Sequence, residues 1–207
     1  MSWRRPAGAG GPAGAMRFEG PPPMSIDPTR TYRAKMETTK GTLTIDLDPV
    51  AAPRTVNSFV FLARRGYFDG VVFHRIIPGF VVQGGDPTGT GSGGPGYRFA
   101  DELPPAHSYE IGSLAMANAG PDTNGSQFFI VSGPDGTRLP PSYSLFGKVV
   151  EGLEVVEELD RAGSPSGRPR ERVAIVSVQI TELPAEGADR LDGAGGPGGS
   201  SGPGTEG

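Results

Sequence analysis

Short runs of alternating apolar and polar residues, each ended by glycine or proline, constrain the fold of this chain more than any other feature. Residues 43–47 and 174–180 alternate in this way, which is typical of strands with one buried face. Gly41 supplies a turn, so residues 32–47 are predicted to form a β-hairpin. Further predicted strands lie within residues 71–85, 114–117, 127–131 and 145–149. Many short strands and frequent turns favour a mainly β fold closed into an antiparallel barrel, because closure removes exposed strand edges.

Only two segments show helical periodicity. The apolar positions of the first are Val56, Phe59, Val60 and Ala63, and those of the second are Leu153, Val156 and Leu159. Residues three and four positions apart share one face of a helix. Pro53 suits the first helical turn, where no hydrogen bond is lost, and Gly66 is a stop signal. The pattern therefore predicts helices over about residues 53–65 and 152–160.

Glycine and proline are concentrated at the two ends of the chain. Residues 1–30 hold 5 Gly and 6 Pro, and residues 184–207 hold 9 Gly and 3 Pro. Segments of this kind lack the apolar surface that would offset the entropy cost of ordering them. We therefore predict disordered tails at 1–30 and 184–207 around a single domain at 31–183.

The charge and the residue types that are missing argue against several classes of function. The net charge is −4 and no run of Lys or Arg forms a basic stripe, which argues against a nucleic-acid partner. No apolar stretch is long enough to span a bilayer, and no signal peptide is recognisable, so we expect a cytoplasmic protein with no membrane association. The absence of cysteine excludes disulfides and thiol catalysis. A single domain without an apolar surface stripe predicts a monomer.

Four segments of the central domain carry the strongest signal about function. They are Phe73-His-Arg-Ile-Ile-Pro-Gly-Phe80, Gln83-Gly-Gly-Asp86, Leu114-Ala-Met-Ala-Asn-Ala-Gly-Pro121 and Asn124-Gly-Ser-Gln-Phe-Phe-Ile130. Together with Phe146-Gly-Lys-Val149, they closely resemble the signatures of cyclophilin-type peptidyl-prolyl cis/trans isomerases, over about residues 32–182. The resemblance implies a closed eight-stranded antiparallel β-barrel capped by two α-helices. It also implies isomerisation of X–Pro bonds in proline-containing polypeptides, assisting protein folding, without a metal or other cofactor.

The chemistry of prolyl isomerisation explains why such a site needs no nucleophile. Delocalisation of the nitrogen lone pair into the carbonyl gives the peptide bond a rotation barrier of about 18–20 kcal/mol. A hydrogen-bond donor aimed at the prolyl nitrogen would localise the lone pair, and an apolar socket would hold the ring while the acyl group turns. Arginine suits the donor role because it is always charged and holds its N–H groups in a rigid fork.

The resemblance assigns a role to each candidate site residue. Arg75 is the predicted catalytic residue; the commoner alternative for an arginine is a surface salt bridge. The predicted substrate-binding residues are Phe80, Val81, Gln83, Ala117, Asn118, Ala119, Gln127, Phe129, Leu139 and Tyr143. The Phe, Val and Leu members would line the proline socket or its rim, although such residues in strands are more often ordinary core. Gln83 would orient Arg75, and residues 117–119 would lie along the substrate backbone, with Asn118 supplying main-chain hydrogen bonds.

The chain departs from the common eukaryotic pattern between Thr137 and Leu145. Tyr143 stands where many relatives have histidine, and neither Thr137 nor Arg138 supplies the tryptophan found there in many relatives. Tyrosine can still donate a hydrogen bond from an aromatic body. Val81 replaces a methionine that is often found in the socket. We therefore predict weaker cyclosporin binding than in tryptophan-containing relatives, with catalysis retained.

Other interpretations remain beside the leading one. Residues 89–94 fit G-x-G-x-x-G, the fingerprint of a dinucleotide site. That fingerprint requires a strand directly before it and a helix after it, and the sequence predicts neither here. We therefore predict a flexible loop beside the site. His74 and His107 lack metal-ligand spacing, so no metal is expected. The chain could instead be a non-catalytic proline-peptide-binding chaperone or scaffold module on the same fold, or a barrel that holds a small ligand. Arg75 with its predicted neighbours favours catalysis.

Overall fold

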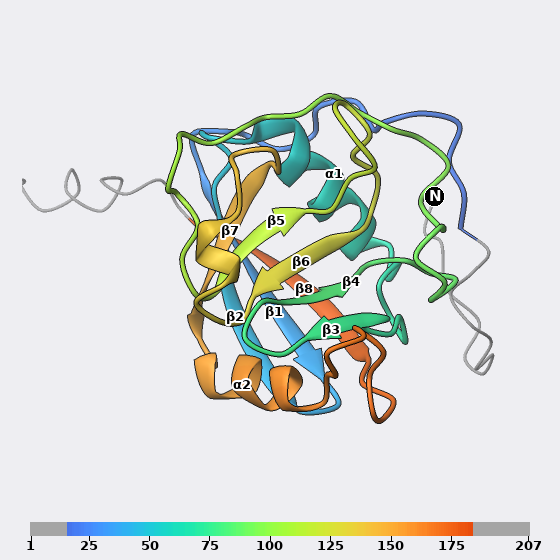
Figure 1. The fold of residues 1–207 in the computed structure, drawn as a ribbon. Helices are drawn as coiled ribbons and strands as arrows, with labels where there is room; N and C mark the ends of the chain where they lie inside the picture. Colours follow the sequence, from blue (N-terminus) through green and yellow to red (C-terminus); the bar gives the residue numbers. More distant parts are fainter. Residues whose placement is uncertain (1–15, 184–207) are drawn as a thin grey trace, which may run out of the picture.

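The computed structural model describes residues 16–183 of the chain; residues 1–15 and 184–207 lie outside the described part (Figure 1). Its strands are β1 (Thr31–Thr38), β2 (Gly41–Leu47), β3 (Arg75–Ile77), β4 (Val81–Gly84), β5 (Ser113–Met116), β6 (Phe128–Val131), β7 (Leu145–Glu151) and β8 (Ile175–Leu183). Its helices are α1 (Pro53–Arg64), α2 (Leu153–Arg161) and the 3-10 turn η1 (Gly136–Arg138). The predicted hairpin and both predicted α-helices are confirmed. The predicted C-terminal tail falls outside the described residues.

The strands form one eight-stranded sheet in the order β3-β4-β6-β5-β7-β2-β1-β8. Every neighbouring pair is antiparallel, and the sheet curls around a core closed by α1 on one side and α2 on another (Figure 1). The ring of Phe59 on α1 lies inside this core, with its centroid 5.1 Å from that of Phe68 and 5.4 Å from that of Phe146. The apolar face that the helical spacing predicts for α1 is therefore the face that fills the curled sheet.

The predicted closure of the barrel is wrong, because the sheet is open between its edge strands β3 and β8. The segment before β3 pairs with the start of β8 and the residues ahead of it. Gly70 and Val71 exchange backbone hydrogen bonds with Ile175, and Val72 forms an isolated antiparallel bridge with Ala174. The loop that follows α2 occupies the free edge of β3 instead. The Ile76 N–H donates to the Gly167 carbonyl at 2.9 Å, and the Ile76 carbonyl accepts from the Ser164 N–H at 3.2 Å. A strand of three residues has no further backbone groups with which to pair β8.

Residues 16–30, which composition assigns to the N-terminal tail, follow a defined course along the domain. The side chain of Ile26 is 6% exposed and belongs to the main core, and the ring of Phe18 lies edge-on to Phe61 with centroids 5.0 Å apart. The Asn57 side chain on α1 hydrogen-bonds to backbone groups of this segment. Single apolar residues and one buried amide fix a segment whose average composition resembles that of a disordered tail.

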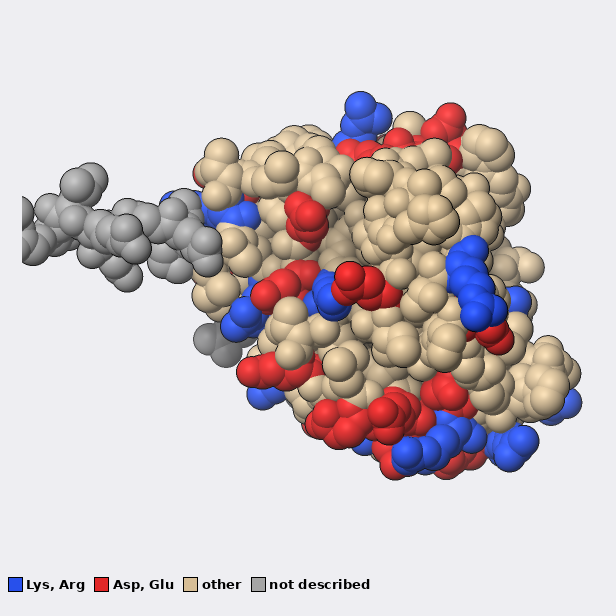
Figure 2. All heavy atoms as spheres, turned by 60° about the vertical axis from the view of Figure 1, so that its left-hand side comes forward, with Lys and Arg blue, Asp and Glu red and all other residues tan. Residues whose placement is uncertain are grey.

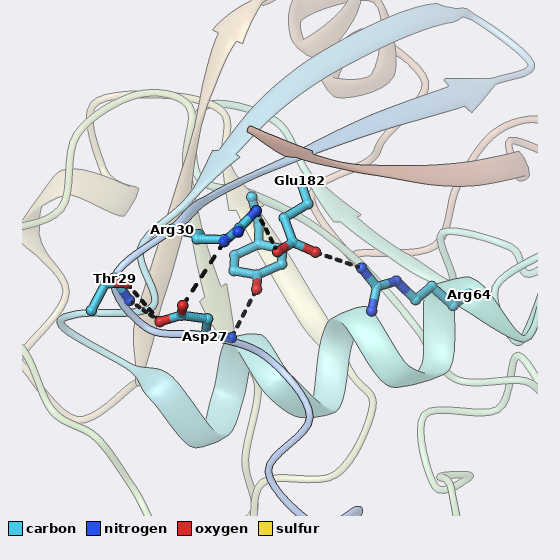
Figure 3. A network of polar contacts seen from close by, with 6 residues as sticks. Asp27, Thr29, Arg30, Arg64 and Glu182 are labelled. Atoms are coloured by element: carbon cyan, nitrogen blue, oxygen red, sulfur yellow. Dashed lines mark hydrogen bonds and ion pairs between the residues drawn. The ribbon is translucent and has the colours of Figure 1, made fainter. Parts of the chain in front are cut away.

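A network of charged side chains joins the end of this segment to β8 and α1 (Figure 3). Arg30 lies 3.3 Å from one carboxylate oxygen of Glu182, and Arg64 lies 3.7 Å from the other. Asp27 accepts hydrogen bonds from the side chain and the backbone of Thr29, which lower its pKa. These side chains are largely solvated, so the network sets the course of the segment more than it stabilises the fold.

Charges of both signs are interspersed over the face shown in Figure 2, with uncharged areas between them. Several are paired at close range; Arg33 and Asp46, for example, approach to 2.6 Å across the β1–β2 hairpin. Among residues 16–183, neither α-helix combines the length and apolar character needed to cross a bilayer.

Candidate active site

The strands β4, β5 and β6 bury side chains on both of their faces. Successive side chains of a strand point to opposite faces of its sheet. One face of these strands supplies the main core with Val82, Leu114, Met116, Phe128 and Ile130. The other face carries a second apolar group, here called the socket cluster, of Val81, Ala115, Phe129 and Val131 with Tyr109. Phe80, Ala117, Leu139, Tyr143 and Leu145 pack around it and are only partly buried. The partial exposure of this rim leaves the socket cluster accessible from outside the fold.

A tight turn between β3 and β4 builds one wall of the socket cluster. The Phe80 carbonyl accepts a hydrogen bond from the Ser132 N–H at 3.0 Å, which fixes the turn against the end of β6. A Cβ added at Gly133 would lie 2.5 Å from the backbone of Gly79. These two backbone segments therefore approach so closely only because Gly133 has no side chain. The position of Phe80 therefore depends on the contact of two backbones.

The opposite wall depends on a buried tyrosine. The Tyr109 hydroxyl donates to the Tyr143 carbonyl at 2.7 Å and accepts from the Tyr143 N–H at 3.2 Å. Burial raises the pKa of Tyr109, so its hydroxyl keeps the proton that it donates. Leu139, which directly follows η1, completes this wall. Tyr143 and Leu139 thus reach the socket cluster from a segment with little regular structure, and the Tyr109 phenol group fixes the backbone of Tyr143.

Arg75 stands at the end of a row of side chains that crosses four strands. The register pairs Arg75 on β3 with Gln83 on β4, Gln83 with Phe129 on β6, and Phe129 with Ala115 on β5. Directly opposite residues have Cβ atoms about 4.5–5.5 Å apart. The guanidinium is therefore placed on the same face of the sheet as the socket cluster, one strand beyond Gln83.

The guanidinium of Arg75 is exposed and only partly engaged. Its Nη1 donates to Gln83 Oε1 at 3.2 Å, and it takes part in no ion pair within residues 16–183. The position of a Cβ on Gly167 would lie 3.3 Å from Arg75 Cγ, so the aliphatic stem rests against the loop that covers the edge of β3. Within the described residues, Arg75 therefore has an amide partner and N–H groups left over. The surface salt bridge, which was the alternative to a catalytic role, is not formed there.

Two glutamines continue the polar contacts away from Arg75. Gln83 Nε2 donates to Gln127 Oε1 at 3.1 Å. Gln127 Nε2 in turn donates to the carbonyls of Gly91 and Gly93, at 2.9 and 3.0 Å. Gln83 and Gln127 are half-buried, and a buried amide normally needs such partners. The glycine-rich segment expected to be a flexible loop beside the site is therefore in contact with site residues.

The buried carboxylate of Asp86 anchors the glycine-rich loop. It is 0% exposed and accepts hydrogen bonds from the backbone of Thr88, Gly91 and Gly93. Burial alone would raise the pKa of Asp86, but the hydrogen bond from the Thr88 hydroxyl and these backbone bonds together outweigh burial and hold the pKa below its ordinary value of 3.8. No helix follows the loop before β5, so the structural context of a dinucleotide site is missing.

The segment at residues 117–119 offers free backbone groups at the edge of the site. The Ala117 N–H donates to the Gln127 carbonyl at 3.0 Å, continuing the pairing of β5 and β6. The Asn118 side chain donates to the Ser142 carbonyl at 2.9 Å and accepts from the Gly120 N–H at 3.2 Å, so both ends of its amide are engaged. Within the described part of the chain, the main-chain N–H and C=O of Asn118 have no hydrogen-bond partner. They remain available to an extended peptide.

An open cavity of about 850 Å³ adjoins the socket cluster. Its walls include Gln83, Gln127 and the segment 117–119, together with the glycine-rich loop. Ala117 lines the cavity and also packs against the socket cluster, so the cavity lies beside the socket cluster. The volume lies within the range of about 300–1,000 Å³ usual for ligand sites.

Every predicted site residue lies in the socket cluster, in the rim packed around it, in the adjoining cavity or in the cross-strand row that begins at Arg75. Their roles in binding and catalysis remain predictions. Sequence reasoning missed Tyr109, Ala115, Val131 and Asp86. The continuous apolar runs at 114–116 and 128–131 carry the signal for Ala115 and Val131, because a strand that is apolar at successive positions buries both of its faces. No such pattern identifies Tyr109 or Asp86.

The histidines take no part in this arrangement. Burial lowers the pKa of His74, whose Nδ1 is buried without a hydrogen-bond partner in the described structure. His107 lies on an exposed loop. Within residues 16–183, His, Asp and Glu side chains do not gather in groups of three that could hold a metal ion.

Relatives of known sequence share this domain. The family model for cyclophilin-type peptidyl-prolyl cis-trans isomerases matches residues 33–180. The human protein named peptidyl-prolyl cis-trans isomerase-like 1 is 45% identical over 162 residues, which cover 76% of this chain and 95% of that protein. A probable peptidyl-prolyl cis-trans isomerase A of Mycobacterium bovis is 43% identical over 173 residues, which cover 74% of this chain and 94% of that protein.

Solved structures agree with the sequence comparison. A cyclophilin-type peptidyl-prolyl cis-trans isomerase of Cryptosporidium parvum superposes with a TM-score of 0.68 at 34% identity, covering 74% of this chain and 99% of that one. The same protein crystallised in the presence of the dipeptide Ala-Pro gives a TM-score of 0.67 at 36% identity, with 72% of this chain and 98% of that one covered. The chain belongs to the cyclophilin-type peptidyl-prolyl cis-trans isomerase family.

Proposed function

We propose that this isomerase seats the proline ring of an X–Pro substrate on the socket cluster and activates the bond with Arg75. One observation carries the proposal: Arg75, Gln83 and Phe129 are consecutive members of one cross-strand row. A ring resting on Phe129 would present its nitrogen toward the guanidinium one strand beyond Gln83. The fold itself therefore supports both the socket and the donor that the chemistry requires.

The guanidinium would lower the barrier by withdrawing the nitrogen lone pair from the carbonyl. Charge-assisted hydrogen bonds are about twice as strong as neutral ones. Each tenfold acceleration needs about 1.4 kcal/mol off the barrier. Within residues 16–183, the guanidinium donates one hydrogen bond, from Nη1 to Gln83, which leaves its other N–H groups for the substrate. Because neither the socket cluster nor Arg75 changes protonation in this step, no general acid or base is needed.

The substrate backbone would lie along residues 117–119, with the acyl residue before proline directed into the open cavity. The unpaired main-chain groups of Asn118 support this placement. The relative crystallised in the presence of Ala-Pro supports the X–Pro unit as the substrate class. We further propose a cytoplasmic monomer, for which a sedimentation mass near 21.5 kDa is the test.

A non-catalytic module that merely holds proline-containing segments is the second candidate. It uses the same socket cluster and the same backbone contacts, so binding data cannot separate the two functions. Turnover does separate them, because only catalysis needs a charged donor beside the prolyl nitrogen.

The decisive experiment measures cis–trans exchange of an Ala-Pro-containing peptide by NMR with wild-type protein, Arg75→Ala and Arg75→Lys. We expect catalysis by the wild type and a loss of about 100-fold or more in Arg75→Ala, about 2.7 kcal/mol. Arg75→Lys keeps the charge without the planar fork and should fall between the two. Arg161→Ala on α2 is the matched control, because this exposed arginine pairs with Glu157 and Glu158 and belongs to neither the socket cluster nor the cavity. Full turnover in Arg75→Ala would refute the assigned role, and peptide binding without wild-type turnover would favour the module.

A further inference from the structure

We infer that Asp86 is a positioning residue for Arg75, which it orients through the glycine-rich loop and two glutamines. The inference rests on the proposed catalytic role of Arg75 but concerns a residue that does not touch the substrate. It follows from hydrogen bonds that link a buried negative charge to the backbone of the loop, the loop to two side-chain amides, and these amides to the guanidinium.

The first step is the anchoring of the loop. Oδ2 of Asp86 accepts from the Gly91 N–H at 2.6 Å and from the Gly93 N–H at 3.0 Å. Oδ1 accepts from the backbone N–H and the hydroxyl of Thr88, both at 2.7 Å. A fully buried carboxylate is costly unless it is hydrogen-bonded, and here four donors from the loop satisfy it. The charge therefore dictates how the loop folds over it.

The second step passes this geometry to Gln127. The two glycines that donate to Asp86 also present their carbonyls to Gln127 Nε2. Both N–H groups of the amide are used in this way, so its Oε1 must point in the opposite direction, toward Gln83. A flipped Gln127 amide would place an oxygen against two carbonyl oxygens.

The third step transmits the orientation to the guanidinium. Because Gln127 Oε1 accepts from Gln83 Nε2, the Oε1 of Gln83 is left to face Arg75. The two side-chain amides thus have one polarity, from the loop carbonyls to the positive charge. The N–H and the C=O of one glycine belong to different peptide groups, so the carboxylate acts on Gln127 by fixing the position of the loop backbone. Neutralising the carboxylate weakens the charge-assisted bonds that hold the loop in this position.

The packing of the loop shows that it is built around the carboxylate. A Cβ added at Gly93 would lie 2.0 Å from Asp86 Oδ1 and 2.6 Å from the Thr88 hydroxyl. Gly91 has a φ of +87°, a conformation that other residues rarely adopt. Both glycines therefore allow the backbone to approach Asp86 as closely as the hydrogen bonds require.

The test compares Asp86→Asn with wild type by two readouts that loss of stability alone does not move. The first is the set of NMR resonances of Arg75 Nε–H and of the Gln83 and Gln127 side-chain amides. The second is the separation of kcat from KM in the folded protein. We expect all three groups of resonances to shift, kcat to fall about tenfold, and KM to stay within about twofold, because the socket cluster is untouched.

Two further variants make the result interpretable. Thr88→Val removes one of the four donors at an exposed position, so it should fold and shift the same resonances in the same direction by less; it decides the question if Asp86→Asn does not fold. Asp48→Asn is the matched control, since Asp48 also accepts backbone N–H groups of its own turn but lies away from Arg75. We expect it to leave the resonances and kcat unchanged.

Unchanged resonances and kcat in folded Asp86→Asn, or in Thr88→Val if Asp86→Asn does not fold, would overturn the inference. This outcome is distinct from failure of the proposed function. If Arg75→Ala is inactive and Asp86→Asn retains full kcat, only the positioning role of Asp86 is lost. If Arg75→Ala is fully active while the resonances still shift in Asp86→Asn, the catalytic role of Arg75 is lost and the structural series remains.

Discussion

The ring of Tyr143 stands edge-on against the ring of Phe129, with centroids 5.4 Å apart and an interplanar angle of 85°. Phe129 belongs to β6, near the middle of the strand order, whereas Tyr143 comes from the segment between η1 and β7. Edge-to-face pairs contribute about 0.5–1.5 kcal/mol beyond the area that they bury. The contact therefore joins Tyr143, on one wall of the socket cluster, to Phe129 within the cluster. We expect the Tyr143 ring to limit the width of the socket.

Replacing Tyr143 should change substrate affinity through the ring more than through the hydroxyl. We expect Tyr143→Ala to raise KM about tenfold, since the ring contact and part of the proline socket are lost together. Tyr143→Phe keeps the ring and should stay within about threefold of wild type. Steady-state kinetics on an X–Pro peptide provide the measurement, and a wild-type KM in Tyr143→Ala would show that the ring does not shape the socket.

The wall that carries Leu139 and Tyr143 also determines the predicted affinity for cyclosporin. Thr137 and Arg138 belong to η1, and the Arg138 side chain is exposed and lies 3.5 Å from Asp135, so neither offers an aromatic surface beside Leu139. We expect wild-type protein to bind cyclosporin more weakly than tryptophan-containing relatives do. Thr137→Trp and Arg138→Trp, made separately, should show which position restores affinity in an inhibition titration. Tight inhibition of the unmodified protein would contradict the prediction.

A carboxylate on α2 holds the turn that carries Phe80. Asp160 accepts from the Gly79 N–H at 3.0 Å and from the Ser132 hydroxyl at 2.6 Å. Asp160→Ala would leave both donors without this acceptor, at a cost of about 1–3 kcal/mol in unfolding free energy. We expect a raised KM as well, since Phe80 loses its support. Chemical denaturation and kinetics would measure the two effects, with exposed Glu157→Ala on the same helix as the control. Loss of stability without a change in KM would separate the turn from the site.

Local patterns predicted the elements of this fold better than the relation between its sheet edges. The hairpin and the helices depend on neighbouring residues, so Leu43, Ile45 and the apolar face of α1 sufficed to predict them. Closure between β3 and β8 depends instead on which segment reaches the free edge of β3. Nothing in the residues around Gly167 indicates that their backbone takes those hydrogen bonds. Composition likewise failed to predict that Phe18 and Ile26 pack against the domain, because two apolar residues scarcely change the average composition of residues 1–30.

The candidate site was predictable wherever its residues lie in recognisable motifs. The row from Arg75 through Gln83 to Phe129 brings together members of three strands, and each carried a motif of its own. Tyr109 could not be predicted, because its contribution is a pair of hydrogen bonds to the backbone of Tyr143, across a separation in sequence that no pattern spans. Long-range contacts of this kind exist only once the sheet has folded.

Stability should decline in mild acid because of His74. Burial is the main cause of its lowered pKa; the negative charge of Asp86 opposes the shift and Arg75 adds to it. A histidine with a lower pKa in the folded than in the unfolded state favours folding only while it is neutral. That contribution is complete above the unfolded value of 6.5 and is lost as the pH falls from there through the folded pKa. We expect the midpoint of thermal unfolding to fall between about pH 7.5 and pH 5, above the range where carboxylates titrate. His74→Gln cannot be protonated and should show a flatter profile over the same interval, whereas an equal slope in the two proteins would assign the acid sensitivity to other groups.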